Sequence, residues 1–240
     1  MKVLLLGGTT EARQLAAALV TDGDQVTTSL AGRVSRPRLP EGDVRVGGFG
    51  GVEGLRAAAE TFDVVVDATH PFAATISAHA AEACAAMPLL LLQRPGWTPT
   101  SADDWTWVGD HAEAAATAAR HARPFLTVGR QPLPDFVEPL ARHPVLARVV
   151  EDVVVPRPWT VVHSRGPYAL PDEIELMTRH GVDVLVTKDS GGEYTRAKLD
   201  AAAALRVHVA VVRRPTAPDG VPVVGTVDAA RRWVRAAAAV

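Results

Sequence analysis

The first 13 residues, MKVLLLGGTTEAR, constrain the fold more than any other segment of the chain. The apolar run Val3–Leu6 is typical of a strand that is buried on both faces of a parallel sheet. It stops at the turn Gly7–Thr10, and Leu15 and Leu19 then continue one face of a predicted helix. A glycine turn before a helix brings backbone N–H groups and the positive end of the helix dipole to one point. The segment therefore predicts a site for the phosphates of a nucleotide, with Thr9 or Thr10 capping the helix or binding a phosphate oxygen.

The turn departs from the G-x-G-x-x-G pattern of dinucleotide-binding units. Its first two glycines are adjacent, and the third small position falls on Ala12 or Arg13. An ordinary strand, turn and helix without a ligand therefore stays open as an alternative for this segment.

The end of the next predicted strand, Gln25–Ser29, favours NADP over NAD. A NAD-binding unit would place an acidic residue there for the ribose hydroxyls, and this chain has none. Ser29 and then Arg33 follow instead, and an arginine suits a 2′-phosphate through a charge-assisted contact. The alternative for Arg33 is a solvated loop residue beside Arg36 and Arg38.

Apolar runs alternate with helical patterns along the whole chain, which predicts the α/β class. Residues 94–108, rich in proline and tryptophan, interrupt the alternation. We therefore expect two Rossmann-like parallel-sheet domains with a cleft between them, an NADP-binding domain at 1–95 and a substrate-binding domain at 96–240. The expected strands are Val3–Leu6, Gln25–Ser29, Asp43–Val46, Asp63–Asp67, Leu89–Leu92, Pro124–Val128, Ala147–Val150, Thr160–His163, Asp183–Thr187 and Val207–Val212.

The composition favours a small-molecule ligand. The formal net charge is −2, so the chain lacks the basic excess of a nucleic-acid-binding protein. Cys84 is the single cysteine and the histidines show no zinc-binding spacing, so we expect no disulfide and no intrinsic metal site. No apolar run reaches the roughly 18 residues of a membrane span, and no signal-peptide pattern precedes the first predicted strand. We expect a cytoplasmic monomer without a nucleic-acid or membrane partner.

Glycine and polar residues cluster directly after the predicted strands of both domains. The carboxyl ends of parallel strands meet at one edge of a sheet, where open α/β sheets bind their ligands. The clusters contain several arginines and a lysine, so a ligand with several carboxylates or phosphates fits them. They are Gly7–Thr10, Asp67–Phe72, Arg94-Pro95, Gly129-Arg130, Ser164–Pro167, Thr187–Gly192 and Arg213–Pro215.

Seven motifs in this order resemble the precorrin-6A reductase family of cobalamin biosynthesis. They are LGGTTEAR, DATHPFA, RP after Leu89–Leu92, TVGRQPL, SRGPY, TKDSGG and VRRP, and they extend from Leu6 to Pro215. The resemblance implies two α/β domains with a cleft between them. It also implies an enzyme that uses NADPH to reduce one double bond of a tetrapyrrole with many acetate and propionate arms, converting precorrin-6A to precorrin-6B.

The resemblance further implies a cofactor site in the first domain. The diphosphate would lie at Gly7, Gly8, Thr9 and Thr10, and the adenosine end at Ser29 and Arg33. The nicotinamide side would be lined by Asp67, Ala68, Thr69, His70 and Pro71.

The implied substrate contacts are cationic or polar residues at strand ends, namely Arg94, Arg130, Arg165, Lys188, Ser190 and Arg213. His70 and Lys188 are the candidate catalytic residues, although pyrrolic nitrogens or solvent could also supply the proton. Each residue has a plainer alternative. His70 can cap and pack a helix start, Lys188 and Ser190 can serve a turn, and single arginines can be surface charges.

Two other functions stay open on the sequence. One is another NADP-dependent Rossmann reductase or epimerase, because Tyr194 and Lys198 have the Tyr-x-x-x-Lys spacing of such enzymes, although late in the second domain. The other is a noncatalytic NADP-binding sensor whose second domain contacts a protein. The motifs also leave open whether the macrocycle carries cobalt and which of its faces receives the hydride.

Overall fold

Residues 1–32 and 39–237 are described by the computed structural model, in which the chain divides into two units. The first unit comprises Met1–Pro95 together with Pro215–Val240, and the second comprises Gly96–Arg214. Short apolar runs form the central strands of both units, because a strand covered by helices on both faces needs apolar side chains on both sides. The predicted α/β class with two parallel-sheet units is confirmed.

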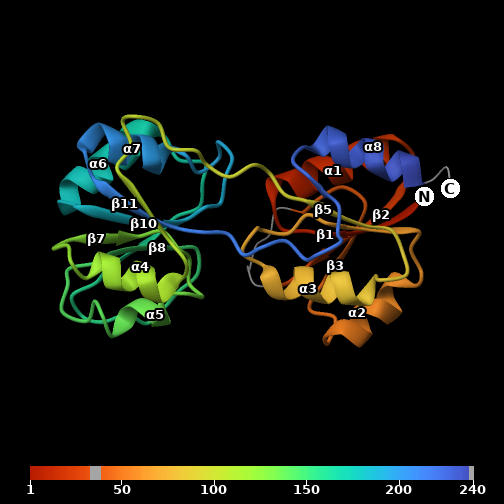
Figure 1. Ribbon diagram of the computed structural model, residues 1–240, viewed down its shortest axis with the longest axis horizontal. Coiled ribbons are helices and arrows are strands. Elements are labelled where there is room, and N and C mark those ends of the chain that lie inside the picture. The colour runs from red at the N-terminus through yellow and green to blue at the C-terminus, as the bar shows by residue number, and fades with distance from the viewer. Residues whose placement is uncertain (33–38, 238–240) are drawn as a thin grey trace. The chain divides into compact units, whose positions relative to one another are not determined.

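The first unit is built on a sheet of six parallel strands (Figure 1). The strands are β1 (Lys2–Leu6), β2 (Gln25–Leu30), β3 (Asp43–Val46), β4 (Val64–Asp67), β5 (Leu89–Leu92) and β12 (Val223–Val224). Their order is β12-β5-β4-β1-β2-β3, so the chain runs outward from β1 in one direction and then returns to build the other half. This is the doubly wound arrangement, whose ligand crevice lies where the strand order reverses, at β1 and β4.

Helices cover both faces of this sheet. They are α1 (Thr10–Thr21), α2 (Val52–Ala59), α3 (Ala74–Ala83) and α8 (Val227–Ala237). Figure 1 shows α1 and α8 on one side of the sheet, with α2 and α3 on the other. Successive side chains of β1 alternate between two cores: Val3 and Leu5 pack with α1 and α8, and Leu4 and Leu6 pack with α2 and α3.

The second unit repeats the doubly wound plan. Its strands are β6 (Trp105–Val108), β7 (Pro124–Leu126), β8 (Leu146–Val149), β9 (Thr160–His163), β10 (Val184–Lys188) and β11 (His208–Val212). All are parallel, in the order β6-β11-β10-β7-β8-β9, so the reversal lies between β7 and β10. Its helices are α4 (His111–Ala118), α5 (Pro134–Val137), α6 (Leu170–His180) and α7 (Ala197–Leu205). Figure 1 shows α6 and α7 together on one face of this sheet.

The last segment of the chain corrects the predicted domain boundary. The prediction of a second domain running over 96–240 is wrong for Pro215–Val240, which belongs to the first unit. Val223 and Val224 pair with Leu91 and Leu92 of β5. Helix α8 packs its buried face on α1 in the same core. The sequence pattern predicts a closing helix here, without β12, and does not indicate which sheet that helix covers.

Within the described ranges, no helix is long and apolar enough to cross a membrane.

Candidate functional site

The turn after β1 requires both of its glycines, for different reasons. A Cβ atom on Gly7 would lie 2.6 Å from Thr28 Cγ2 of the neighbouring strand β2, so only glycine fits there. Gly8 has a φ of 124°, which side chains with L chirality rarely adopt. A Cβ atom on Gly8 would meet no atom within 4 Å. The backbone of Gly8 therefore borders open space at the carboxyl end of β1, where a ligand can approach it closely.

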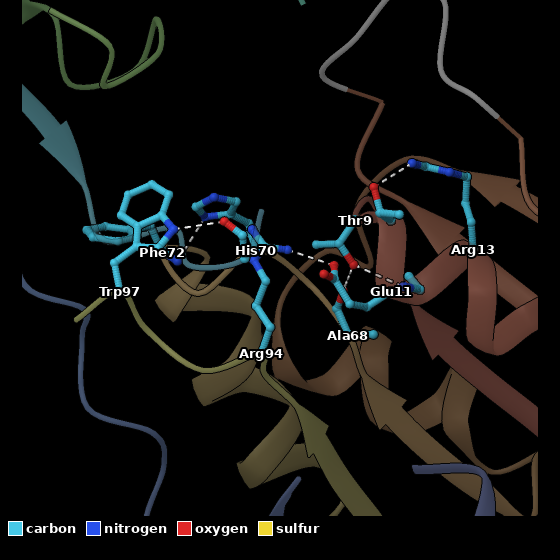
Figure 2. Close-up of polar contacts among 11 residues, drawn as sticks. Thr9, Glu11, Arg13, Ala68, His70, Phe72, Arg94 and Trp97 are labelled. Carbon is cyan, nitrogen blue, oxygen red and sulfur yellow. Dashed lines mark hydrogen bonds and ion pairs between the residues drawn. The ribbon is translucent and has the colours of Figure 1, made fainter. Parts of the chain in front are cut away.

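Thr9 caps helix α1 and ties the turn to the loop after β4. Its Oγ1 accepts a hydrogen bond from the Ala12 N–H at 3.1 Å and donates one to the Ala68 carbonyl at 2.7 Å (Figure 2). Thr10 Oγ1 accepts a hydrogen bond from Arg13 Nη2 at 2.9 Å. The first turn of a helix has N–H groups that make no bond within the helix. Together with the helix dipole they make this N-terminus suitable for an anion.

An ion pair neutralises the acidic residue in the first turn of α1. Arg94, which follows β5, places Nη1 2.7 Å from Glu11 Oε2, and both side chains are partly buried (Figure 2). An uncompensated Glu11 carboxylate would oppose an anion at the helix N-terminus. The structure therefore gives Arg94 a role in the first unit, and its predicted contact with substrate stays a prediction.

Asp67 holds the loop after β4. Its side chain is buried, and Oδ1 accepts hydrogen bonds from the N–H and hydroxyl of Thr69 at 3.0 and 2.7 Å. Oδ2 accepts one from Ser77 Oγ at 2.5 Å. His70 Nδ1 accepts a hydrogen bond from the Phe72 N–H at 3.2 Å. These contacts fix the shape of the loop that begins at Asp67, and the predicted cofactor contacts of its residues stay predictions.

A cation lies at the predicted adenosine end of the site, and it is Arg45 on β3. Arg45 Nη1 donates a hydrogen bond to Ser29 Oγ at 2.9 Å, and the two residues are opposite each other in the paired strands. The guanidinium carbon lies 3.9 Å from the centroid of the Phe49 ring, and Nη2 donates to the Gly48 carbonyl at 3.2 Å. Arg33, for which this role is predicted, lies outside the described residues.

The glycine-rich run Gly47–Gly51 directly follows β3 and, like Arg45, is not part of the seven sequence motifs. Gly47, Gly50 and Gly51 have positive φ, and a Cβ atom on any of them would meet nothing within 4 Å. The signal that could have found it is the sequence GGFGG itself, placed directly after a predicted strand.

In the second unit, Lys188 is the last residue of β10, and Ser190 lies in the loop that follows. Burial lowers the pKa of Lys188 to about 8. The Ser190 N–H donates a hydrogen bond to the Lys188 carbonyl at 2.6 Å. Asp189 anchors the loop, because Oδ1 accepts from the Trp97 N–H at 2.9 Å and Oδ2 lies 3.1 Å from Arg214 Nε.

The structure brings the remaining predicted substrate residues of this unit to the same edge of its sheet. Arg130, Arg165 and Arg213 follow β7, β9 and β11, and all three are exposed. The Arg213 guanidinium lies 5.3 Å from the centroid of the Trp107 ring. Their contacts with substrate stay predictions.

A family model described as precorrin-6x reductase CbiJ/CobK matches residues 2–235 of the chain. The chain belongs to the precorrin-6x reductase family. The family predicted from the seven motifs is confirmed. Membership makes the protein a reductase of cobalamin biosynthesis, in place of the epimerase and the noncatalytic sensor that the sequence leaves open.

Individual members of the family support the match over nearly all of this sequence. A precorrin-6A reductase of Rhodococcus erythropolis is 47% identical over 97% of both chains. One of Mycobacterium tuberculosis is 48% identical over 97% of both chains. A solved structure of CobK precorrin-6A reductase is 37% identical, covers 99% of this chain and 97% of its own, and superposes with a TM-score of 0.91.

The reductase also holds buried charges in its second unit that the motifs do not include. Arg148, Glu173 and Lys198 are each at most 6% exposed. In the sequence, Lys198 is marked only by its Tyr-x-x-x-Lys spacing with Tyr194, and nothing separates Arg148 and Glu173 from surface residues. Over residues 1–32 and 39–237, no group of three or more His, Cys, Asp or Glu side chains is arranged to hold a metal ion.

Proposed function

We propose that this reductase uses NADPH to convert metal-free precorrin-6A to precorrin-6B, with the cofactor on the first unit and carboxylate arms of the substrate on the second. The observation that carries the cofactor assignment is Arg45, whose guanidinium is bonded to Ser29 at the carboxyl end of β2. In doubly wound folds the adenosine ribose lies beyond this strand, where an acidic residue selects NAD. A guanidinium in its place favours the 2′-phosphate of NADPH.

The residues of the first unit fit a dinucleotide. Open space beside Gly8 and the N–H groups at the start of α1 suit a diphosphate held by Gly7–Thr10. Ser29 and Arg45 would hold the 2′-phosphate, and the Phe49 ring supports the guanidinium from one side. Arg33 is proposed as a further contact of this phosphate.

The residues after β4 would line the nicotinamide side. NADPH, when bound, supplies a hydride, and a proton completes the reduction of a double bond. The hydrogen bonds of Asp67 hold the segment Ala68–Pro71 in one shape, which suits a site that must fix geometry and exclude water. His70 and Lys188 are our candidate proton donors. The lowered pKa of Lys188, about 8, makes its ammonium group a stronger acid than an exposed lysine.

The substrate assignment is supported by the relatives and by the charges of the second unit. The relatives that are 47 and 48% identical are named for precorrin-6A without cobalt, which favours the metal-free macrocycle. Arg130, Arg165, Lys188 and Arg213 place positive charge at one edge of the second sheet, with Ser190 beside them, and this suits acetate and propionate arms.

Replacement of Arg45 tests the cofactor assignment. Arg45→Ala should raise the Kd of NADPH about 10- to 100-fold, because a charge-assisted contact of about 1.5–3 kcal/mol is lost, while the Kd of NADH changes less than twofold. Isothermal titration calorimetry measures both. Arg56→Ala is the matched control, since Arg56 is an arginine of the same unit that pairs with Glu53 on the surface of α2. If Arg45→Ala weakened the binding of NADPH and of NADH by the same factor, a contact between Arg45 and the 2′-phosphate would be contradicted.

A further inference from the structure

The interior of the second unit contains an ion pair between Arg148 and Glu173, in which both carboxylate oxygens of Glu173 bind the guanidinium. Arg148 on β8 donates two hydrogen bonds to Glu173 on α6, from Nη2 to Oε1 at 2.7 Å and from Nη1 to Oε2 at 3.1 Å. Both side chains are almost fully buried. The guanidinium carbon also lies 4.2 Å from the centroid of the Tyr168 ring and 4.9 Å from that of Phe125. This two-point contact commits Glu173 to Arg148.

Lys198 on α7 is a second buried cation in the same interior. It is 5% exposed, and its Nζ lies 5.3 Å from the centroid of the Trp97 ring. In the described part of the chain, no carboxylate oxygen lies within 4.0 Å of this Nζ: Glu173 pairs with Arg148, and Asp200 pairs with Arg196. A ring face stabilises a buried ammonium group far less than a carboxylate does.

The charges that act on Lys198 come from three neighbouring elements. Among the described residues, Arg148 and Lys188 are the cations that act on it, and Glu173 is the acidic group. Burial, with the two cations adding to it, lowers the pKa of Lys198 to about 7. An ammonium group in such surroundings is costly unless an anion joins it.

Lys198 is connected to the loop of the proposed substrate site through Trp97. The Trp97 indole Nε1 donates a hydrogen bond to the Gly192 carbonyl at 2.8 Å, and its backbone N–H donates to Asp189. Both acceptors lie in the loop that directly follows Lys188, the last residue of β10. The ring that faces Lys198 is therefore fixed to the segment that carries Lys188 and Ser190.

We propose that Lys198 binds a carboxylate arm of the tetrapyrrole as a buried ion pair and takes up a proton as that arm binds. The inference rests on the proposed substrate of the second unit and adds a residue that the motifs do not indicate. At pH 8 a group with a pKa of about 7 is about one-tenth protonated. A carboxylate partner favours the charged form and raises the pKa, so binding should draw close to one proton from solution.

The lysines of this chain make the test direct, because there are only three: Lys2, Lys188 and Lys198. Protein labelled with [13C]lysine gives three side-chain Cε signals, assigned with Lys2→Arg and Lys188→Arg variants. The Lys198 signal should titrate near pH 7 in the free protein. In the anaerobic complex with precorrin-6A, without NADPH, the same titration should move up by more than one pH unit.

Lys198→Met provides a second measurement. It should raise the Kd of precorrin-6A at least tenfold and abolish proton uptake, measured by calorimetry at pH 8 in buffers of different ionisation enthalpy. Its Kd for NADPH should stay within twofold. Lys2→Met is the matched control, because Lys2 is exposed on the first unit, and it should change neither value.

The outcomes separate this inference from the proposed function. Binding of precorrin-6A with an unmoved Lys198 titration would overturn the role of Lys198 and leave the substrate assignment standing. Failure of the unmodified protein to bind precorrin-6A would overturn both. The titration of the unmodified protein decides the matter even where Lys198→Met does not fold.

Discussion

At the scale of single residues, Lys198 should make the stability of the reductase depend on pH. Burial lowers its pKa in the folded protein to about 7, whereas the unfolded chain has an ordinary lysine near 10.5. Between these values the unfolded state binds more protons, so the free energy of unfolding rises with pH, by up to about 1.4 kcal/mol per pH unit. Below pH 7 the folded protein carries the full cost of the buried charge.

Urea unfolding of the unmodified protein and of Lys198→Met at pH 7 and pH 9 measures this effect. Lys198→Met lacks the titrating group. Its free energy of unfolding should therefore exceed that of the unmodified protein by more at pH 7 than at pH 9. The titration of Lys188 is common to both proteins and largely cancels in the difference. If the difference in the free energy of unfolding between the two proteins is the same at pH 7 and pH 9, burial does not lower the pKa of Lys198.

The residues that could be predicted from the sequence are those whose role is local. Gly7 and Gly8 interrupt an apolar run, and Thr9 stands at a helix start, so their turn is visible in the chain itself. The roles of Arg45 and Lys198 could not be predicted, although Lys198 stands four residues after Tyr194, because each role depends on partners that only the fold brings near. Arg45 reaches Ser29 across two paired strands, and Lys198 is buried by elements from elsewhere in the second unit.

At the scale of elements, β12 and α8 complete the first unit from the far end of the chain. Val234 of α8 is 1% exposed and belongs to the core that contains Leu15 and Leu19 of α1. Arg231 adds a hydrogen bond from Nε to Asp22 Oδ2 at 2.5 Å, at the end of α1. Arg235 adds another to Oδ1 at 2.7 Å. The packing and the ion pairs together bind α8 to α1.

Val234→Ala should therefore destabilise the first unit and spare the second. Removing two buried carbon atoms costs about 2 kcal/mol, which increases opening of the sheet about 30-fold. Hydrogen exchange measured by mass spectrometry should show faster exchange in β1 and β4 and unchanged exchange in β7 and β10. Val154→Ala, at a position 97% exposed, is the control and should change neither unit. Loss of protection in β7 and β10 instead would place α8 with the second unit.

Most strands could be predicted because they are apolar runs that end at glycine or polar clusters. The two exceptions are short or atypical. Strand β12 has two residues in a segment rich in proline and glycine, and β6 has two partly buried tryptophans on either side of the exposed Thr106. Both strands lie at an edge of their sheet. An edge strand has a neighbouring strand on one side only and is less buried, so it needs fewer apolar residues. Because β12 has only two residues, the sequence does not show that the last segment returns to the first sheet, and its domain could not be predicted.

At the scale of the whole molecule, two doubly wound units divide the proposed task. The first presents a glycine turn, a helix N-terminus and Arg45 at the carboxyl edge of its sheet, which suits a phosphorylated cofactor. The second presents exposed arginines and Lys188 at the same edge of its own sheet and holds Lys198 in its interior, which suits a polycarboxylate. Membership of the family establishes reduction as the activity. The glycine turn and Arg45 of the first unit favour NADPH, and the cations of the second unit favour a tetrapyrrole with carboxylate arms.

The most direct test of this account is an anaerobic turnover assay with the unmodified protein. Metal-free precorrin-6A and its cobalt form are each offered with NADPH or NADH, and the tetrapyrrole product is identified by mass spectrometry. We expect precorrin-6B, with one hydride and one proton added, at a rate at least tenfold higher with NADPH than with NADH and higher for the metal-free substrate. Equal rates with the two cofactors, or no reduction of precorrin-6A with NADPH, would contradict the account.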